Sequence, residues 1–403
     1  MRVLLSAFAC HPSHGSEPGT GWHWVEALAG LGHEVTVVTT ARYRDEILPR
    51  CPPGVDFRFV DLPPQPTGEW PDFVRLLHAY GAYGRWQYRA FRQIEVEAQQ
   101  YDVAHHVTYG GLHMGSELWR LPIPLLYGPV GGGQTAPASY WRYFGRQWPS
   151  EMLRTASAGP LLKLNRRCRQ TVKNSAVTLV NNSATAAACR RLGGTDIRYM
   201  MCDGLASEWI ADARQQPAGP PVVLWVGSLL PRKAPTLAVR AFAELRRAVP
   251  ARLVIAGDGP LRAQVNATIE SLGLAQDVQM LGKLPREDIR SLYDSASVLL
   301  FSSLRESFGA PFLEALGRGL PAVAPDLAGI ADADVGPAAV KVPLPPRPDD
   351  LPGRLASAMQ TILCDDEWES RSVAAVKWAA EWTWQVKAAA ATQIYEEIAG
   401  RRR

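Results

Sequence analysis

Short apolar runs alternate with longer amphipathic segments along the first half of the chain. Runs of four to six mostly apolar residues predict buried strands at 3–8, 35–39, 103–107, 124–127, 177–181 and 197–201. Between the first two runs, residues 21–31 have the pattern of a helix that ends at Gly32. Strands that alternate with helices in this way predict a parallel, doubly wound sheet.

The alternation stops at a stretch rich in proline and glycine and then begins again. Residues 203–221 contain the run Gln-Gln-Pro-Ala-Gly-Pro-Pro, which is typical of a linker. Further strands are predicted at 222–226, 253–256, 278–281, 298–301 and 322–324, with helices at 234–248, 260–272, 288–295 and from residue 311. Three helices are expected from about residue 349 onwards.

We therefore predict an α/β protein with two doubly wound, parallel-sheet domains. The predicted divisions are an N-terminal domain at 1–205, a linker at 206–221, a C-terminal domain at 222–384 and a final helix at 385–403 that returns to the N-terminal domain. Two such domains are expected to face a central cleft, which is where small ligands usually bind.

Composition narrows the class of protein. The chain has 403 residues, enough for two domains, and its 47% hydrophobic and 20% charged residues exclude a disordered chain. A net charge of +4 is too small to indicate a nucleic-acid partner, and no apolar run approaches the roughly 20 residues of a membrane span. Six scattered cysteines without a Cys-x-x-Cys pair predict reduced, buried thiols, no zinc site and a cytoplasmic protein.

One stretch of the first half is strongly basic. Residues 142–173 hold eight basic side chains and a single acid, Glu151, and four aromatic residues lie at 141, 143, 144 and 148. This pattern has two interpretations. It is either a solvated helical face with aromatic packing, or a patch that contacts an anionic acceptor or a membrane surface.

The most specific motif lies at residues 305–314, where two glutamates stand eight positions apart. Glu306 would lie on a loop between a strand and a helix, and Gly309 and Ala310 would present backbone N–H groups at the helix N-terminus, which suits a phosphate. Glu314 would lie one turn into the helix, where it could accept hydrogen bonds from ribose hydroxyls. The alternative is two surface carboxylates near a helix start.

This glutamate pair resembles the signature of the retaining family-4 glycosyltransferases, which have the GT-B fold of two Rossmann-like domains. Residues 226–233 resemble the diphosphate-binding strand and loop of that family, 256–260 its second glycine loop and 281–284 the strand end that binds the base. Residues 319–324 and 382–384 also agree, so the resemblance runs in order through nearly the whole C-terminal half.

The resemblance implies roles for individual residues. Glu306 would orient the donor sugar, and Arg232 and Lys233 would neutralise the departing diphosphate without a metal. The implied donor-binding set is Gly19, Gly227, Ser228, Gly257, Gly282, Lys283, Leu284, Ser307, Phe308, Gly309, Ala310 and Glu314. Two positions depart from the family pattern, because Ser228 stands where an arginine is common and Ala234 where a glycine is usual.

The N-terminal half resembles the family less closely. Glu17 in the glycine-rich segment 15–22 could bind acceptor hydroxyls, and Gly131 and Gly132 could line the acceptor or phosphate side through exposed N–H groups, or form a structural turn. His105 and His106 end a predicted strand and point to opposite faces, so one is expected to face the cleft. We favour His106 as that catalytic residue, with a core histidine as the alternative.

Together these features predict a cytoplasmic, retaining and metal-independent glycosyltransferase. It would move a sugar from a nucleoside diphosphate sugar to an acceptor hydroxyl, on a glycan, a lipid-linked molecule or a natural product, by front-face displacement. We expect no cofactor beyond the nucleotide-sugar co-substrate, a monomer or weak dimer, and peripheral membrane contact through residues 141–173 if the acceptor lies at a membrane. The alternatives are a GT-B-fold nucleotide-sugar epimerase, a phosphorylase and a nucleotide-sugar-binding regulatory module.

Overall fold

The structure is a computed structural model that describes residues 1–62 and 72–401. It divides into two compact units: Met1–Gly133, Ala158–Cys202 and Trp384–Arg403 form the first, and Gln134–Ser157 with Asp203–Thr383 form the second. The segment Gln134–Ser157 therefore lies in the second unit, whereas the sequence placed it in the N-terminal domain. The final segment is grouped with the first unit, and residues 402–403 of it lie outside the described residues.

The first unit is built on a seven-stranded parallel sheet with the order β3-β2-β1-β4-β5-β6-β7. Its strands are β1 (Arg2–Ser6), β2 (Glu34–Thr40), β3 (Val55–Val60), β4 (Val103–His106), β5 (Leu125–Val130), β6 (Val177–Val180) and β7 (Ile197–Tyr199). Six of these strands are predicted by their apolar runs. The edge strand β3 was missed because Asp56 and Arg58 interrupt its apolar residues.

Helices cover both faces of this first sheet. On one face, α1 (Ser16–Gly30) and α14 (Trp384–Gly400) pack on the sheet through Trp24, Leu28 and Tyr395. On the other face, Trp86 of α3 (Asp72–Ile94) and Val172 of α5 (Arg166–Asn174) share a core with residues of α6 (Ser183–Arg191). Helix α2 (Arg44–Ile47) also belongs to this unit, whereas α4 (Trp148–Leu164) begins in the second unit and ends in the first.

Helix α1 begins five residues earlier than the sequence predicts. Its first turn contains Glu17 and Pro18, and both residue types are favourable there. Gly19 and Gly21 let this turn approach the preceding loop, because a Cβ at these positions would lie 2.4 Å from the carbonyl oxygen of His14 and 2.2 Å from that of Ala9. The predicted glycine-rich loop is therefore largely helix.

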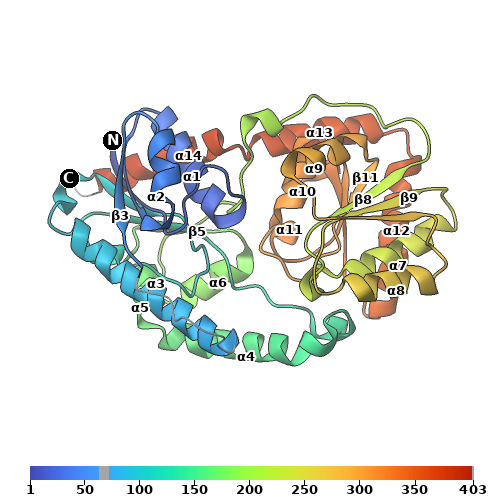
Figure 1. Ribbon diagram of the computed structural model, residues 1–403, viewed down its shortest axis with the longest axis horizontal. Helices are drawn as coiled ribbons and strands as arrows, with labels where there is room; N and C mark the ends of the chain where they lie inside the picture. The colour runs from blue at the N-terminus through green and yellow to red at the C-terminus, as the bar shows by residue number, and fades with distance from the viewer. Residues whose placement is uncertain (63–71, 402–403) are drawn as a thin grey trace. The chain divides into compact units, whose positions relative to one another are not determined.

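The second unit is built on a six-stranded parallel sheet with the order β10-β9-β8-β11-β12-β13. Its strands are β8 (Val222–Val226), β9 (Arg252–Ala256), β10 (Val278–Gly282), β11 (Val298–Leu300), β12 (Ala322–Pro325) and β13 (Ala339–Val342). Its helices are α7 (Pro235–Arg246), α8 (Arg262–Ser271), α9 (Arg286–Ser295), α10 (Ala310–Gly317), α11 (Ala328–Asp332), α12 (Leu351–Cys364) and α13 (Trp368–Ala380). Figure 1 shows α7, α8 and α12 together on one side of this sheet.

The strand order sets where chemistry can occur in the second unit. Chain order runs outwards from β8 in one direction through β9 and β10, and in the other through β11, β12 and β13. In parallel sheets, ligands bind beyond the carboxyl ends of the strands at the point where the order reverses. That point lies between β8 and β11. The motif at 226–233 begins at the end of β8, and the motif at 305–314 follows β11.

Two further predictions concern the cysteines and the possibility of a membrane-spanning helix. The six cysteines are free thiols, of which Cys10, Cys168 and Cys189 are buried, while Cys364 is exposed. Over the described ranges 1–62 and 72–401, no helix combines the length and apolar character needed to cross a bilayer.

Candidate active site

Three glycines bring the loops after β8, β9 and β10 into direct backbone contact. The N–H of Gly227 donates to the carbonyl oxygen of Ala256 at 3.0 Å, and the N–H of Gly257 donates to that of Gly282 at 2.7 Å. A Cβ on Gly257, which has a φ of +147°, would lie 1.9 Å from the carbonyl oxygen of Gly227. Only glycine fits there, so these residues form a side-chain-free floor.

Two cations and a carboxylate meet above this floor. The Nζ atom of Lys233 lies 3.3 Å from Oε2 of Glu306, and Nη1 of Arg232 donates a short hydrogen bond to the same oxygen. Lys233 also lies across Gly227, because a Cβ there would approach its Cδ to 3.1 Å. The side chains are 29%, 11% and 20% exposed for Arg232, Lys233 and Glu306, so each remains accessible while much of its charge is shielded from water.

Glu314 lies one turn into α10, as the motif predicts. Its Oε2 atom accepts a hydrogen bond of 3.0 Å from the hydroxyl of Tyr293, and Arg286 lies 3.9 Å from Oε1. Burial raises the pKa of Glu314, and the charge of Arg286 acts against that rise. The second carboxylate oxygen has no closer ion-pair partner than Arg286 among the described residues, which suits it to accept a hydrogen bond from a ligand hydroxyl.

The loop that carries Glu306 is held by a segment from far away in the sequence. Glu151 of α4 lies 2.9 Å from Nε of Arg305 and 2.7 Å from Nη2 of Arg154, and its side chain is only 8% exposed. Gln134 donates a hydrogen bond of 2.8 Å to the hydroxyl of Ser307. These contacts flank Glu306 on both sides. Sequence reasoning missed them, although a single acid in a basic stretch was the available signal.

The residues predicted to bind the donor differ in how accessible they are in the structure. Ser228 and Lys283 are exposed at this edge, Leu284 is half-buried, and Gly309 caps α10 with Ala310 as the first helical residue. Phe308 requires a correction, because its ring is 3% exposed and packs on Phe312 and Trp378. Its side chain therefore belongs to the core, and only its backbone can serve the site.

The departure at Ala234 has a visible consequence. This residue caps the N-terminus of α7 in the left-handed region, with a φ of 46° and a ψ of 54°, and it is fully buried. A residue with a Cβ pays about 1–2 kcal/mol in this conformation, whereas glycine adopts it freely. The backbone turn needed to place Lys233 is thus retained at a cost in stability.

The first unit contributes a cavity of about 630 Å³ at the carboxyl edge of its sheet. Its walls include the aromatic side chains of Phe8, Tyr43, Tyr80 and Tyr109. Glu17 also lines it, and its two carboxylate oxygens accept the N–H groups of Tyr109 and Gly110 at 2.8 and 3.2 Å. Glu17 therefore fixes the loop after β4 as well as bordering the cavity.

The assignment of His106 as a catalytic residue is not met in the structure. His106 is 1% exposed, its Nδ1 lies 3.0 Å from the hydroxyl of Ser6, and its Nε2 lies 3.4 Å from that of Tyr83. His105 is equally buried, between the hydroxyl of Tyr395 at 2.6 Å and the carbonyl of Gly128 at 2.7 Å. Both are core histidines with protein partners, and burial lowers the pKa of each to about 3. The histidine that lines the cavity is instead His113, to which no sequence pattern pointed.

Of the two interpretations of Gly131 and Gly132, exposed N–H groups or a structural turn, the structure favours the turn. Gly131 donates to the carbonyl of Gly110 at 2.7 Å, and the N–H of Leu112 donates back to Gly131. Gly133 donates to the hydroxyl of Thr185 at 3.2 Å. Gly132 has a φ of +122° and turns the chain between them. The N–H groups of Gly131 and Gly133 therefore bond within the protein, as in a structural turn.

Some basic side chains of residues 142–173 have partners within the protein, and others are exposed to solvent. Arg142 pairs with Asp349 at 3.1 Å, Arg154 pairs with Glu151, and Arg167 lies over the ring of Tyr83. The side chains that remain exposed at its C-terminal end are Lys163, Arg166, Arg169 and Lys173. Leu161 and Leu164, beside these cations, are 59% and 80% exposed.

Comparisons with known proteins agree with this geometry. Residues 208–363 match the model of the family described as glycosyl transferases group 1. D-inositol 3-phosphate glycosyltransferase from Corynebacterium diphtheriae is 34% identical over 187 residues, which is 44% of this chain and 43% of that protein. The match thus spans less than half of the curated relative.

Solved structures extend the likeness to nearly the whole chain, at the level of the fold. Sucrose-phosphate synthase from Thermosynechococcus elongatus superposes with a TM-score of 0.67 and 20% identity, covering 98% of this chain and 99% of that one. Anabaena HepE in complex with UDP gives a TM-score of 0.62 and 17% identity, covering 99% and 100%. The predicted fold class is confirmed, because the chain has the GT-B fold; its segment 208–363 matches the model of the glycosyl transferases group 1 family.

Proposed function

We propose that this protein is a glycosyltransferase that uses a nucleoside diphosphate sugar. One observation carries the proposal: Arg232 and Lys233 converge on Glu306 above the glycine floor formed by the loops after β8, β9 and β10. Two cations beside a backbone free of side chains can stabilise the charge of a departing diphosphate, and a carboxylate beside them can bind a sugar. The family match over 208–363 and the likeness to HepE, which was solved with UDP, support this choice.

The proposed reaction begins with loss of the nucleoside diphosphate from the anomeric carbon. Negative charge then grows on the β-phosphate while the sugar becomes oxocarbenium-like. Lys233 and Arg232 would stabilise the phosphate charge, and Glu306 would bind the sugar and stabilise positive charge near the anomeric carbon. Because these two cations already carry the task, we propose that the transfer needs no metal. Glu314 would hold the ribose hydroxyls.

We further propose that the configuration of the sugar is retained. What supports this proposal is the resemblance of residues 305–314 to the signature of the retaining glycosyltransferases. In a front-face displacement, the departing phosphate oxygen accepts the proton of the acceptor hydroxyl as the new bond forms. Proton NMR of the product, which reads the anomeric coupling constant, distinguishes retention from inversion.

The acceptor is proposed to bind in the aromatic-walled cavity of the first unit. Phe8, Tyr43, Tyr80 and Tyr109 offer ring faces to a molecule that itself carries a ring, such as a sugar or a cyclitol. Arg42 and His113 add polar groups to the same walls. Replacing Tyr80 by Ala is then expected to raise the KM for the acceptor and to leave the KM for the donor unchanged.

We propose peripheral contact with an anionic membrane for the exposed end of the basic stretch. Leu161 and Leu164 are apolar and exposed, and Lys163, Arg166 and Arg169 stand beside them. Apolar side chains flanked by cations suit a membrane surface. Vesicles with phosphatidylserine should sediment the protein, and the pair Arg166→Glu and Arg169→Glu should abolish sedimentation. A wild-type protein that ignores such vesicles would identify the stretch as a solvated face.

The donor experiment tests the central proposal. The protein is screened by thermal shift against UDP-, GDP-, TDP- and ADP-sugars, and the stabilising donors are then assayed for hydrolysis and transfer by mass spectrometry. We expect one nucleotide class to raise the melting temperature of wild type, with much less effect on Lys233→Ala. Absence of any stabilising nucleotide sugar would reject the proposal.

The product distribution separates the alternative activities. An epimerase would change the configuration of the sugar while it stays joined to the nucleotide or is released without an acceptor. A phosphorylase would require inorganic phosphate, and a regulatory module would bind the donor without turnover. Transfer of labelled sugar to a hydroxyl, with release of the nucleoside diphosphate, is the result expected here.

A further inference from the structure

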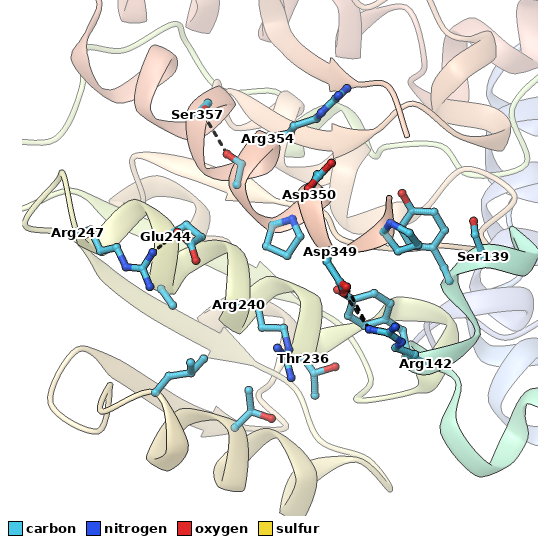
Figure 2. Close-up of a pocket in the computed structure, with 18 of the residues that line it drawn as sticks. Ser139, Arg142, Thr236, Arg240, Glu244, Arg247, Asp349, Asp350, Arg354 and Ser357 are labelled. Carbon is cyan, nitrogen blue, oxygen red and sulfur yellow. Dashed lines mark hydrogen bonds and ion pairs between the residues drawn. The ribbon is translucent and has the colours of Figure 1, made fainter. Parts of the chain in front are cut away.

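The second unit contains a cavity of about 690 Å³ that does not belong to the candidate active site. It lies among α7, α8, the start of α12 and the segment around Tyr143, and none of its lining residues comes from the loops after β8, β9, β10 or β11. Its volume is within the range of small-molecule sites. Figure 2 shows the side chains that line this cavity.

Hydrogen-bond donors gather at one end of this cavity. Arg240 and Thr236 of α7 line the cavity together with Arg142, which is paired with Asp349 (Figure 2). Tyr143 lines the same cavity. Arg240 takes part in no ion pair among the residues that the structure describes, and only Nη1 of Arg142 contacts Asp349.

The cluster has an excess of positive charge. Arg142 and Arg240 are two cations against the single anion Asp349, and the other charged residues of the cavity, Glu244 with Arg247 and Asp350 with Arg354, balance in number. The Arg142–Asp349 pair is 64% and 74% exposed, so opening it costs little. We propose that this cavity binds a small phosphomonoester with a hydroxyl-bearing body, whose phosphate lies between Arg240 and Arg142.

The rest of the cavity suits the body of such a ligand. Hydroxyl and amide side chains line it, from Gln264 and Thr268 of α8 and Ser357 of α12. At Gly353, in the first turn of α12, a Cβ would meet no atom within 4 Å, so the space there is open. Polar walls of this kind can hydrogen-bond a sugar or polyol.

The cavity is linked to the loop that carries Glu306 through the segment Gln134–Ser157. Arg142 and Tyr143 belong to the segment Gln134–Ser157, whose Gln134 and Glu151 hold Ser307 and Arg305 on either side of Glu306. A ligand that fixes Arg142 and Tyr143 would therefore restrain the segment that positions Glu306. Its regulatory effect rests on the proposed function, but its binding does not.

The test is isothermal titration of ribose 5-phosphate, with ribose and inorganic phosphate as comparisons. We expect ribose 5-phosphate to bind wild type at least tenfold more tightly than either comparison. Arg240→Gln should weaken binding at least tenfold, and Asp349→Asn should strengthen it, because Arg142 is then released for the phosphate. Arg252→Gln, an exposed arginine of β9 outside the cavity, should leave binding unchanged.

A second set of variants excludes binding at the active site. Lys233→Ala disables the proposed donor site, so ribose 5-phosphate should still bind this variant if the cavity is the site. Loss of binding in Lys233→Ala with retention in Arg240→Gln would overturn the proposal, as would equal binding of ribose or phosphate, or no binding at all. Hydrogen exchange reads the regulatory link: protection of residues 305–308 by ribose 5-phosphate is expected, and its absence would refute that link.

Discussion

Glu151 offers the sharpest test of how the second unit positions Glu306. Its side chain is 8% exposed and contacts Arg305 at 2.9 Å and Arg154 at 2.7 Å. The change Glu151→Gln keeps the volume and removes the charge, so Arg305 loses its only carboxylate partner among the described residues while 21% exposed. Full burial would make this loss worth roughly 3–5 kcal/mol, and partial exposure reduces it to about 1–3 kcal/mol.

Glu151→Gln is expected to lower kcat strongly and the melting temperature only slightly. Arg305 precedes Glu306, and a displacement of a positioned group by about 1 Å can cost roughly 100-fold in rate. With the donor identified by the screen, kcat should fall about 10- to 100-fold, while KM for the donor changes less than threefold. A melting temperature lowered by a few degrees should accompany this change.

A matched control and a double-mutant cycle separate positioning from general destabilisation. Asp294→Asn removes a carboxylate that bonds Arg318 at 2.7 Å in the same unit, and it should lower the melting temperature with little effect on kcat. Arg305→Gln and Glu151→Gln together should be less harmful than the sum of the two single changes. A Glu151→Gln enzyme with wild-type kcat and a lowered melting temperature would refute the positioning role.

Four further predictions concern the site, the backbone and pH. Lys233→Ala should reduce transfer by 100- to 1000-fold, about 3–4 kcal/mol of barrier, without lowering the melting temperature; wild-type turnover would remove it from the site. EDTA should leave activity intact, and loss that Mg²⁺ or Mn²⁺ restores would assign the diphosphate to a metal. Ala234→Gly should raise stability by about 1 kcal/mol in urea unfolding, because its φ is 46°, and an unchanged midpoint would contradict the strain. Burial lowers the pKa of His105 and His106 to about 3, so below about pH 6.5 the unfolded chain binds more protons than the folded chain. Stability should therefore fall by about 1 kcal/mol per histidine from pH 6.5 to 5.5, and a flat curve would show that they are not buried neutral.

The sequence predicted the parts of the fold that have strong local patterns. In the second unit, β8 spans the predicted residues 222–226, and Glu306 and Glu314 lie on the loop and the helix turn where the motif places them. These predictions were correct because β8 is a continuous apolar run and because Glu306 and Glu314 are only eight positions apart in the sequence. The missed strand β13 (Ala339–Val342) contains Lys341 and follows a proline-containing turn, so its apolar run is too short to stand out.

Features that depend on tertiary contacts were not predictable in the same way. The strand period places His105 and His106 on opposite faces, but it says nothing about what covers each face. Helix α3 brings Tyr83 over His106, and α14 brings Tyr395 over His105, from positions 23 residues before and 290 residues after them. The bonds at Gly131 were equally hidden, since its N–H partner is in the loop 110–112, which has no secondary-structure pattern of its own.

The segment Gln134–Ser157 accounts for two shortcomings of the prediction: the sequence assigned it to the N-terminal domain, and its contacts with the loop that carries Glu306 were missed. Sequence patterns divide a chain at linkers, so the break near residue 206 placed the segment 134–157 in the N-terminal domain, away from the loop that carries Glu306. The structure instead draws Glu151 and Gln134 into the second unit, where they contact Arg305 and Ser307. A fragment cut at the linker would keep Arg232, Lys233, Glu306 and Glu314, yet it would leave Arg305 without its carboxylate. The motif residues therefore define which groups do chemistry, whereas a segment more than 150 residues earlier in the sequence holds their loop in place.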